Sequence, residues 1–372
     1  MSGKKVGILT LPIKNNYGGI IQLVALYHFL QSKGHNPIWI DKKHWHRPLK
    51  RNLIKLLEKN PLYQIYDPKD FAKIDLLHQQ IRPFLEEYLP NQTQEIYNLT
   101  QLKKATQHID TFVVGSDQIW RLEYVKDNYP TYFLDFVSQE KTKIAYAASF
   151  GKDYWEGDEN SVQTVSNLLK KFDFVSVRED TAVSVCRETF DYDKAVHVLD
   201  PTFLPEVSFY ENLIHSIDFN KKTELFNYVL DANPFSDELV ESISNQKKLA
   251  VHKIYLNNSS SESKTSLVEN WLAHFYYADF VITDSFHGMV FSIIFNKQFL
   301  VIGNKERGLT RFTSLLKLLG LENRIITNKD DLQEKITDQK IDYNLITSKL
   351  DILKKHAQSI LLENITNNCK SE

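Results

Sequence analysis

The chain has 372 residues, a length typical of two domains at roughly 150 residues per domain. Its 42% hydrophobic and 25% charged residues exclude disorder as the main state. The 45 Lys and Arg against 47 Asp and Glu give a net charge of −2, so the basic surplus needed for nonspecific binding to nucleic acid or anionic membranes is missing. Any anion must therefore be bound at a local site.

Glycine is scarce, with 12 residues where an average share of about 7% predicts roughly twice as many. Two cysteines, Cys186 and Cys369, exclude a disulfide framework and a four-cysteine zinc site. The N-terminus has no apolar signal core, and the longest apolar stretch, Met289 to Phe295, is far below the roughly 20 residues that span a bilayer. We therefore expect a cytoplasmic protein with no transmembrane segment, with peripheral membrane contact left open.

The first forty residues predict one βαβ unit. Apolar runs at Val6 to Leu11 and Pro37 to Asp41 indicate strands, and the spacing of apolar residues from Gly19 to Lys33 indicates a helix between them. Such a unit predicts a parallel sheet. The polar segment near residues 44–100 is interpreted as a helical insertion.

Further runs of strand length follow in two series separated by helical segments. The first series is Thr111 to Val114, Lys143 to Ala147, Phe174 to Val177 and Ala195 to Leu199. The second is Leu225 to Leu230, Leu249 to Tyr255, Phe280 to Thr283 and Gln298 to Ile302. We predict an N-terminal Rossmann-like domain over 1–205, a C-terminal one over 206–342, and a crossing helix and tail over 343–372.

Six of these strands lead into clusters of polar residues or glycine. The clusters are Asn15 to Gly19, Gly115 to Gln118, Ala148 to Gly151, Arg178 to Asp180, Asp200 to Thr202 and Asp284 to Gly288. Turn chemistry alone explains any one of them equally well. Because ligands bind beyond the carboxyl ends of strands in open α/β sheets, all six together predict one cleft between the domains.

His287 is the sharpest single candidate, because it falls in or next to the first turn of a helix. Free backbone N–H groups and the helix dipole attract anions there. The dipole lowers the pKa of an imidazole and a bound polyanion raises it, which suits a general acid near neutrality. The alternative is a histidine that only satisfies hydrogen bonds at the helix end.

Arg178 follows a buried strand, and its fork of donors suits a carboxylate or phosphate. The alternative for Arg178 is a salt bridge with Glu179 or Asp180. Asp117 and Asp284 are candidate general bases, or equally helix N-caps.

A second basic group follows the strand at Gln298 to Ile302. Lys305, Arg307 and Arg311 form a small basic cluster there, or simply a solvated helix start.

Several chemistries are excluded by their motifs. The sequence has no Walker phosphate loop, dinucleotide fingerprint, HExxH motif or GxSxG motif. No histidine pair has carboxylates at metal-ligand spacing, and His44 and His46 are interpreted as surface residues. No metal site and no cofactor are predicted.

The strand-end motifs resemble the polysaccharide pyruvyl transferase family from about Val6 to Gly320. The motifs are Asn16-Tyr17-Gly18-Gly19 with Gln22, Val114 to Trp120, Tyr146 to Gly151, Ser176 to Glu179, Leu199 to Thr202 and Thr283 to Gly288. The resemblance implies two Rossmann-like domains facing a cleft, as in GT-B glycosyltransferases, with the C-terminal helix packing back on the N-terminal domain.

The resemblance also implies a reaction. The enolpyruvyl group of phosphoenolpyruvate would pass to two hydroxyls of a sugar, giving a pyruvate ketal and phosphate. The acceptor would be a capsule or exopolysaccharide, or its lipid-linked or nucleotide-linked precursor. The essential histidine of the family matches His287, and Arg178 is a plausible donor-binding residue.

One departure from the family pattern concerns the donor. Many members carry Arg-Leu before the His-Gly pair, where this chain has Ser285-Phe286. Lys305, Arg307 or Arg311 would then supply the missing cation. The further residues expected to bind substrate are Asn16, Tyr17, Gly18, Gly19, Ser116, Ser149, Asp284, Ser285 and Gly288.

In the expected mechanism His287 protonates the methylene carbon or assists phosphate departure, and Asp117 deprotonates a sugar hydroxyl. Tyr17 and Trp120 are candidates to stack on the sugar, although core packing is the stronger expectation for Trp120. Two other functions stay open. One is a glycosyltransferase with a nucleotide-sugar donor, and the other is a non-catalytic binding protein of a polysaccharide operon.

Overall fold

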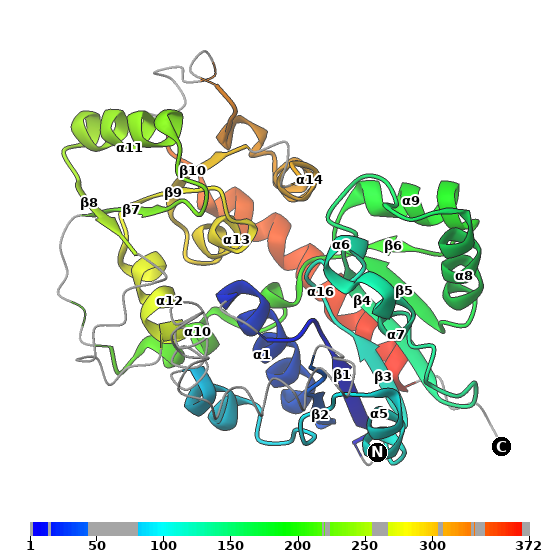
Figure 1. Ribbon diagram of the computed structural model, residues 1–372. Helices are drawn as coiled ribbons and strands as arrows, with labels where there is room; N and C mark the ends of the chain where they lie inside the picture. Colours follow the sequence, from blue (N-terminus) through cyan, green and yellow to red (C-terminus); the bar gives the residue numbers. More distant parts are fainter. Residues whose placement is uncertain are drawn as a thin grey trace, which may run out of the picture.

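The protein consists of two α/β domains, each built on one parallel sheet, and a long C-terminal helix that contacts both (Figure 1). In this computed structural model the described residues are 3–13, 16–43, 81–217, 219, 224–254, 267–303, 308–328, 331 and 339–366. The predicted fold class is confirmed.

The N-terminal sheet has six parallel strands in the order β2-β1-β3-β4-β5-β6. Its strands are β1 (Lys5–Leu9), β2 (Asn36–Ile40), β3 (Thr111–Val114), β4 (Thr142–Ala148), β5 (Phe174–Val177) and β6 (Val196–His197). The helices of this domain are α1 (Tyr17–Ser32), α5 (Leu99–Thr106), α6 (Leu122–Val125), α7 (Tyr129–Tyr132), α8 (Glu159–Leu169) and α9 (Asp180–Phe190). The central strands are apolar throughout because helices cover both faces of the sheet.

The C-terminal sheet has five parallel strands in the order β11-β10-β9-β7-β8. Its strands are β7 (Glu224–Tyr228), β8 (Ala250–Lys253), β9 (Phe280–Thr283), β10 (Gln298–Ile302) and β11 (Ile325–Ile326). Its helices are α10 (Val207–Ile214), α11 (Pro234–Lys247), α12 (Leu267–Tyr277), α13 (Phe286–Ile294) and α14 (Thr310–Leu319). The sequence did not predict β11, because two residues are too short to show a period.

Each sheet reverses its strand order once. The reversal lies between β1 and β3 in the N-terminal sheet and between β7 and β9 in the C-terminal sheet. Such switch points open a crevice beyond the carboxyl ends of the strands, because the connections on either side leave in opposite directions. The polar clusters that follow β1, β3 and β9 therefore lie at the points where the strand order reverses.

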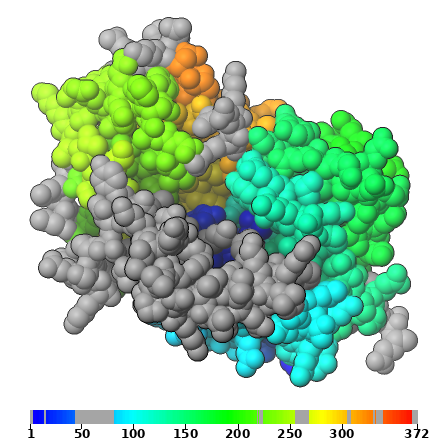
Figure 2. Space-filling view, viewed as in Figure 1, coloured from blue at the N-terminus to red at the C-terminus, as the bar shows by residue number. Residues whose placement is uncertain are grey.

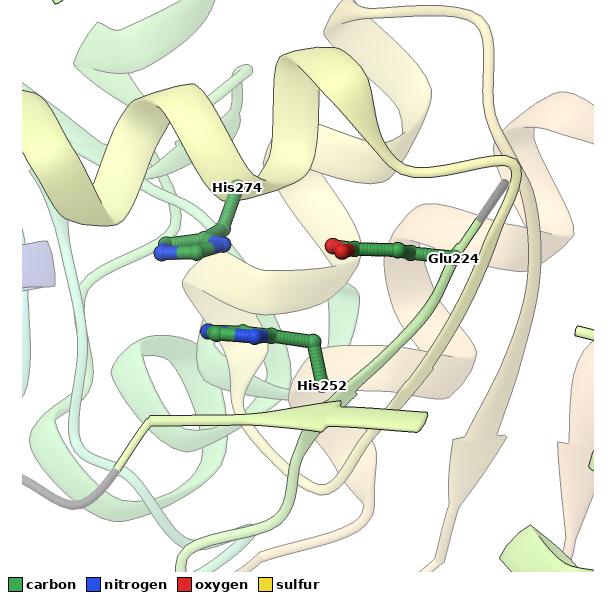
Figure 3. Close-up of side chains that lie close together, drawn as sticks. All are labelled: Glu224, His252 and His274. Atoms are coloured by element: carbon green, nitrogen blue, oxygen red, sulfur yellow. The ribbon is translucent and has the colours of Figure 1, made fainter. Parts of the chain in front are cut away.

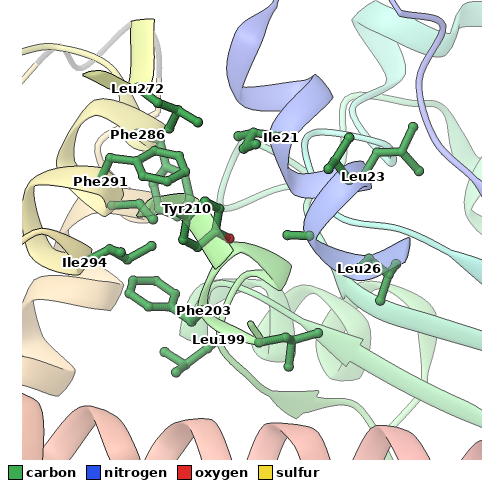
Figure 4. Packing of buried hydrophobic residues seen from close by; sticks show 14 of the residues in the cluster. Ile21, Leu23, Leu26, Leu199, Phe203, Tyr210, Leu272, Phe286, Phe291 and Ile294 are labelled. Carbon is green, nitrogen blue, oxygen red and sulfur yellow. The ribbon is translucent and has the colours of Figure 1, made fainter. Parts of the chain in front are cut away.

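The two domains share one hydrophobic core, and α1 lies at its centre. This helix is apolar on all sides, which is typical of a helix buried on all sides rather than at a surface. Figure 4 shows Ile21 and Leu26 of α1 on one side and Phe291 of α13 on the other, with Tyr210 of α10 between them. The domains are therefore joined by apolar packing as well as by the chain.

The C-terminal helix α16 (Tyr343–Thr366) extends from the C-terminal domain back to the N-terminal sheet, as expected (Figure 1). Near its start, the Tyr343 hydroxyl bonds to the carbonyl of Lys297. Further along, Gln358 Nε2 donates to the carbonyl of Leu204 at 2.7 Å. Across the described residues, no helix is both long and apolar enough to cross a bilayer.

The predicted insertion near residues 44–100 is described only in part, because 44–80 lie outside the described residues. Residues 81–88 are helical, and the segment after them pairs beside β2 through parallel bridges from Trp39 to Gln92 and from Lys42 to Ile96.

Replacing Phe291 with Ala should lower the free energy of unfolding by about 3–5 kcal/mol, because it leaves a cavity in the shared core. The Phe291 ring lies 5.2 Å from that of Tyr210 and 5.4 Å from that of Trp271. Urea unfolding followed by circular dichroism measures the change. Ile352→Ala on α16 is the control, since Ile352 is 71% exposed. Equal effects of the two variants would contradict a shared core.

Candidate active site

Side chains that follow five strands of the N-terminal sheet and one strand of the C-terminal sheet form one continuous polar network. Hydrogen bonds and ion pairs connect Asn16 to Asp117, Asp117 to Arg178, Arg178 to Glu179 and Asp200, Glu179 to Ser149, and Asp200 to Ser116. The ring of His287 lies beside Asp200, with Nε2 3.9 Å from Oδ2. The six predicted clusters thus meet at one place.

Arg178 is the centre of this network. Its guanidinium bonds to three carboxylates, with Nη1 3.0 Å from Asp200 Oδ2, Nη2 3.3 Å from Asp117 Oδ1 and Nε 3.3 Å from Glu179 Oε1. Burial alone would lower the pKa of Arg178, but the three carboxylates outweigh it and raise the pKa. The ion pair with Glu179, which was the alternative expectation for Arg178, is present. Because three carboxylates already occupy its guanidinium, Arg178 would have to rearrange to bind an anionic ligand as well.

Asp200 and Glu179 both lie in the network, although neither was among the predicted site residues. The Oδ2 of Asp200 accepts from Ser116 Oγ at 2.7 Å, and its Oδ1 accepts from the backbone N–H of Thr202 at 3.0 Å. Burial would raise its pKa, but His287 and Arg178 outweigh burial and lower the pKa. Asp200 is therefore an ionised carboxylate that faces both Arg178 and His287. It accepts four hydrogen bonds, from Ser116 Oγ, from Arg178 Nη1, and from the N–H and Oγ1 of Thr202.

Glu179 differs from the other two carboxylates. Its Oε1 accepts from Ser149 Oγ at 2.5 Å and from Arg178, whereas its Oε2 is buried and has no hydrogen-bond partner among the described residues. Burial outweighs the attraction of Arg178 and raises the pKa of Glu179. A buried carboxyl group with a raised pKa is a candidate for proton transfer.

Asp117 lies between the start of α1 and Arg178. Its Oδ2 accepts from Asn16 Nδ2 at 2.9 Å, and Asn16 also caps α1 through the backbone N–H of Gly19. The backbone of Asp117 is left-handed, with φ of 66°, a conformation that costs energy for a residue other than glycine and clusters at functional sites. Burial would raise its pKa, but Arg178, His287 and Arg311 outweigh it and lower the pKa.

His287 lies in the first turn of α13, as predicted, and faces the N-terminal domain. Its Nε2 is 3.9 Å from Asp200 Oδ2, and this nitrogen is buried with no hydrogen-bond partner in the described part of the chain. Burial lowers the pKa of His287, and this outweighs the opposite effect of Asp200 and Asp117. The ring is therefore neutral near pH 7 and has one unused nitrogen in the network.

Gly18 explains how the ring of His287 fits between the domains. A methyl group at Gly18 would lie 2.1 Å from His287 Nδ1, so only glycine leaves room for the imidazole. The first turns of α1 and α13 therefore approach each other at this point. Unpaired N–H groups and the dipoles of two helix starts favour an anion here.

The segment before His287 has a structural role. The Asp284 carboxylate accepts from the backbone N–H groups of Leu230 at 2.7 Å and Asp231 at 2.9 Å, so it joins the loops at the switch point. The N-cap of α13 is Ser285, whose Oγ accepts from the N–H of Gly288. Asp284 is therefore neither the N-cap nor placed beside His287 as a general base.

Phe286 and Arg311 cover Arg178 from the C-terminal domain. The Phe286 ring lies 4.5 Å from the Arg178 guanidinium carbon and 5.9 Å from that of Arg311. Burial and repulsion from Arg178 lower the pKa of Arg311 to about 10. Arg311 is thus in the site, as predicted, whereas Lys305 and Arg307 lie outside the described residues.

The two aromatic residues proposed for sugar stacking belong to the core instead. Trp120 is fully buried, and its Nε1 donates to the carbonyl of Tyr132. The Tyr17 ring is 4% exposed and packs 5.7 Å from that of Trp271, and burial raises the pKa of Tyr17 to about 12. Core packing of Trp120, the stronger expectation for that residue, is therefore confirmed, and the expectation that Tyr17 stacks on a sugar is corrected, since its ring is buried.

The surface is hollowed between the two domains on the face seen in Figure 2. Figure 2 shows N-terminal residues, in blue, at the bottom of a hollow between the yellow-green C-terminal domain and the cyan and green N-terminal domain. A small cavity of about 20 Å³ lies beside Asn16, Gly19 and Asp117 at the end of β1.

The neutral state of buried His287 predicts how stability depends on pH. Its folded pKa lies below the ordinary value of 6.5, so the unfolded chain takes up a proton at higher pH than the folded protein. The contribution of neutral His287 to the free energy of unfolding is complete above about pH 6.5. It is lost as pH falls toward the folded pKa, by at most about 1.4 kcal/mol per pH unit. Urea unfolding of wild type and His287→Gln between about pH 7.5 and 5.5 measures it, with exposed His108→Gln as control. A slope unchanged by His287→Gln would refute the assignment.

Comparison with known proteins identifies both the fold and the family. The S. aureus MnaA structure with UDP superposes with a TM-score of 0.55 at 12% identity, covering 99% of this chain and 98% of that one. A candidate UDP-N-acetylglucosamine 2-epimerase from Listeria monocytogenes gives 0.52 at 11% identity, covering 100% and 97%. These likenesses show the GT-B-like fold alone. No curated protein sequence matched the chain.

The family is shown by sequence. The polysaccharide pyruvyl transferase family model matches residues 16–306, which span the network from Asn16 to His287. The chain therefore belongs to the polysaccharide pyruvyl transferase family.

Proposed function

We propose that the protein transfers the enolpyruvyl group of phosphoenolpyruvate to two hydroxyls of one sugar, in a surface polysaccharide or its precursor, forming a pyruvate ketal and releasing phosphate. Family membership supports the transferase class. The observation that carries the proposal is the unpartnered Nε2 of His287, buried between two helix starts and 3.9 Å from Asp200.

The helix starts of α1 and α13 supply the attraction for the donor. Phosphoenolpyruvate carries a phosphate and a carboxylate, and both suit backbone N–H groups at a helix N-terminus. Arg178 and Arg311 add two guanidinium groups beside these helix starts. Their charges are largely offset by carboxylates, so binding relies on placed donors more than on net charge.

His287 is suited to move the proton that starts the reaction. A donor phosphate next to His287 would raise the pKa of the imidazole, and the ring would then carry a proton toward the methylene carbon. Protonation turns the methylene into a methyl group and leaves an oxocarbenium-like carbon that a sugar hydroxyl attacks. Asp200 faces the ring and stabilises its cationic form, so we assign it as the positioning residue.

The remaining protons need two acceptors. Addition of the first hydroxyl forms one C–O bond and releases one proton. Departure of phosphate breaks the C–O bond between the donor carbon and the phosphate. Addition of the second hydroxyl closes the ketal and releases a second proton. One of the two released protons restores the proton that His287 gave to the methylene carbon, and the other leaves with phosphate. Asp117, ionised and at the end of β3, is our choice as the base. Glu179 is the second candidate, since its Oε2 is unpartnered in the described structure.

Replacing His287 with Gln should lower turnover by roughly 10²–10⁴-fold with the fold retained, because the proton donor is lost. The assay measures phosphate released from phosphoenolpyruvate with lipid-linked and nitrophenyl sugars as acceptors. His108→Gln is the matched control. Near-normal phosphate release by His287→Gln would refute the role of His287, and release of nucleotide from nucleotide sugars would indicate a glycosyltransferase instead.

Gly18→Ala tests the position of the imidazole rather than its chemistry. The added methyl group would overlap His287 Nδ1, so we expect turnover to fall by at least about tenfold. Alanine is a better helix former than glycine by about 1 kcal/mol, so α1 itself should tolerate the change. Gln31→Ala, at an exposed position of the same helix, should retain wild-type turnover. Unchanged turnover of Gly18→Ala would show that the ring is free to move.

A further inference from the structure

A second cluster of polar side chains lies in the C-terminal domain and takes no part in the proposed reaction. It consists of Glu224 at the start of β7, His252 in β8 and His274 on α12. One ligand atom of each residue lies within 4.8 Å of the others. The network around Arg178 lies at the opposite, carboxyl ends of the strands.

The sheet register explains why these residues meet. Strands β7 and β8 are parallel and pair Phe226 with His252, so both side chains lie on one face of the sheet. Glu224 lies two residues before Phe226, and side chains two apart in a strand share a face. Helix α12 covers this face and places the ring of His274 4.1 Å from that of His252 and 5.2 Å from that of Phe226.

The three side chains point toward one another, but their polar atoms are not paired with other described residues. Figure 3 shows the carboxylate of Glu224 reaching toward the two imidazole rings, which come from α12 and β8. Among the described residues, none of the three side chains makes a hydrogen bond or an ion pair. A neutral ring keeps a lone pair for a cation.

We propose that Glu224, His252 and His274 bind one divalent transition-metal ion, with Zn²⁺ the best match and water completing its coordination. Two imidazoles and one carboxylate form a common protein ligand set for this ion. Bonds of about 2.0–2.2 Å place tetrahedral donor atoms roughly 3.3 Å apart. The half-buried side chains of Glu224 and His252 must therefore turn inward, while His274 keeps its packing against Phe226.

The ion would join β7, β8 and α12, which already meet through strand pairing and through the packing of aromatic rings. Strand β8 is at the edge of the sheet and pairs with β7 alone among the described strands. Its Val251 is 46% exposed, so little apolar burial holds the strand. A shared ion would hold β8 to β7 and to α12.

The test uses Co²⁺ as a spectroscopic probe on the metal-stripped full-length protein. We expect one Co²⁺ per chain, with the visible absorption of four-coordinate Co²⁺, and displacement of Co²⁺ by Zn²⁺ because Zn²⁺ binds such sites more tightly. His252→Asn and Glu224→Gln should each weaken Co²⁺ binding at least about tenfold, the lower end of what even outer-shell changes cost. Both residues are half-exposed, so the two variants are expected to fold.

The controls are changes of the same type elsewhere, His108→Asn and Glu241→Gln, both at exposed positions. They should bind Co²⁺ as wild type does, and Zn²⁺ should raise the melting temperature of wild type and controls but not of His252→Asn or Glu224→Gln. Absence of a bound ion in wild type at micromolar Co²⁺ would overturn the proposal. Equal binding by wild type and both site variants would overturn it too.

Discussion

The buried guanidinium of Arg178 is the constraint on which the site depends. Removing an ion from water costs several kcal/mol, and only near-complete pairing offsets that cost. Asp117, Glu179 and Asp200 provide the pairing, and they follow three different strands of one sheet. Fixing Arg178 therefore fixes the ends of β3, β5 and β6, and with them the partners of Asn16 and His287.

The charge of the network limits how a donor binds. Asp117, Glu179 and Asp200 exceed the positive charges of Arg178 and Arg311 by one when all are ionised. The raised pKa of Glu179 identifies the carboxyl group that most readily accepts a proton to relieve this excess. The proposed anionic donor would thus depend on the two helix starts, at which Gly18 lets α1 approach the imidazole of His287.

The sequence predicted the parts of the site that depend on local pattern. The spacing of apolar residues placed β3, β5 and β9 at their observed bounds, and His287 in the first turn of α13. The role of Asp200 could not be predicted, because its contact with Arg178 depends on β5 and β6 being neighbours. Trp120 and Tyr17 likewise have no local signal that distinguishes a core ring from a stacking platform. The trio of Glu224, His252 and His274 comes from three separate elements and leaves no spacing motif.

The two passages of the chain between the domains are bonded to each other. Lys354 and Gln358 of α16 donate to the carbonyls of Pro205 and Leu204, where the chain first leaves the N-terminal domain. The two crossings therefore hold each other in place where the domains meet, next to the core that the domains share. That core brings α13 against α1, so the contact of His287 with Gly18 and Asp200 depends on segments that lie far from all three residues in the sequence.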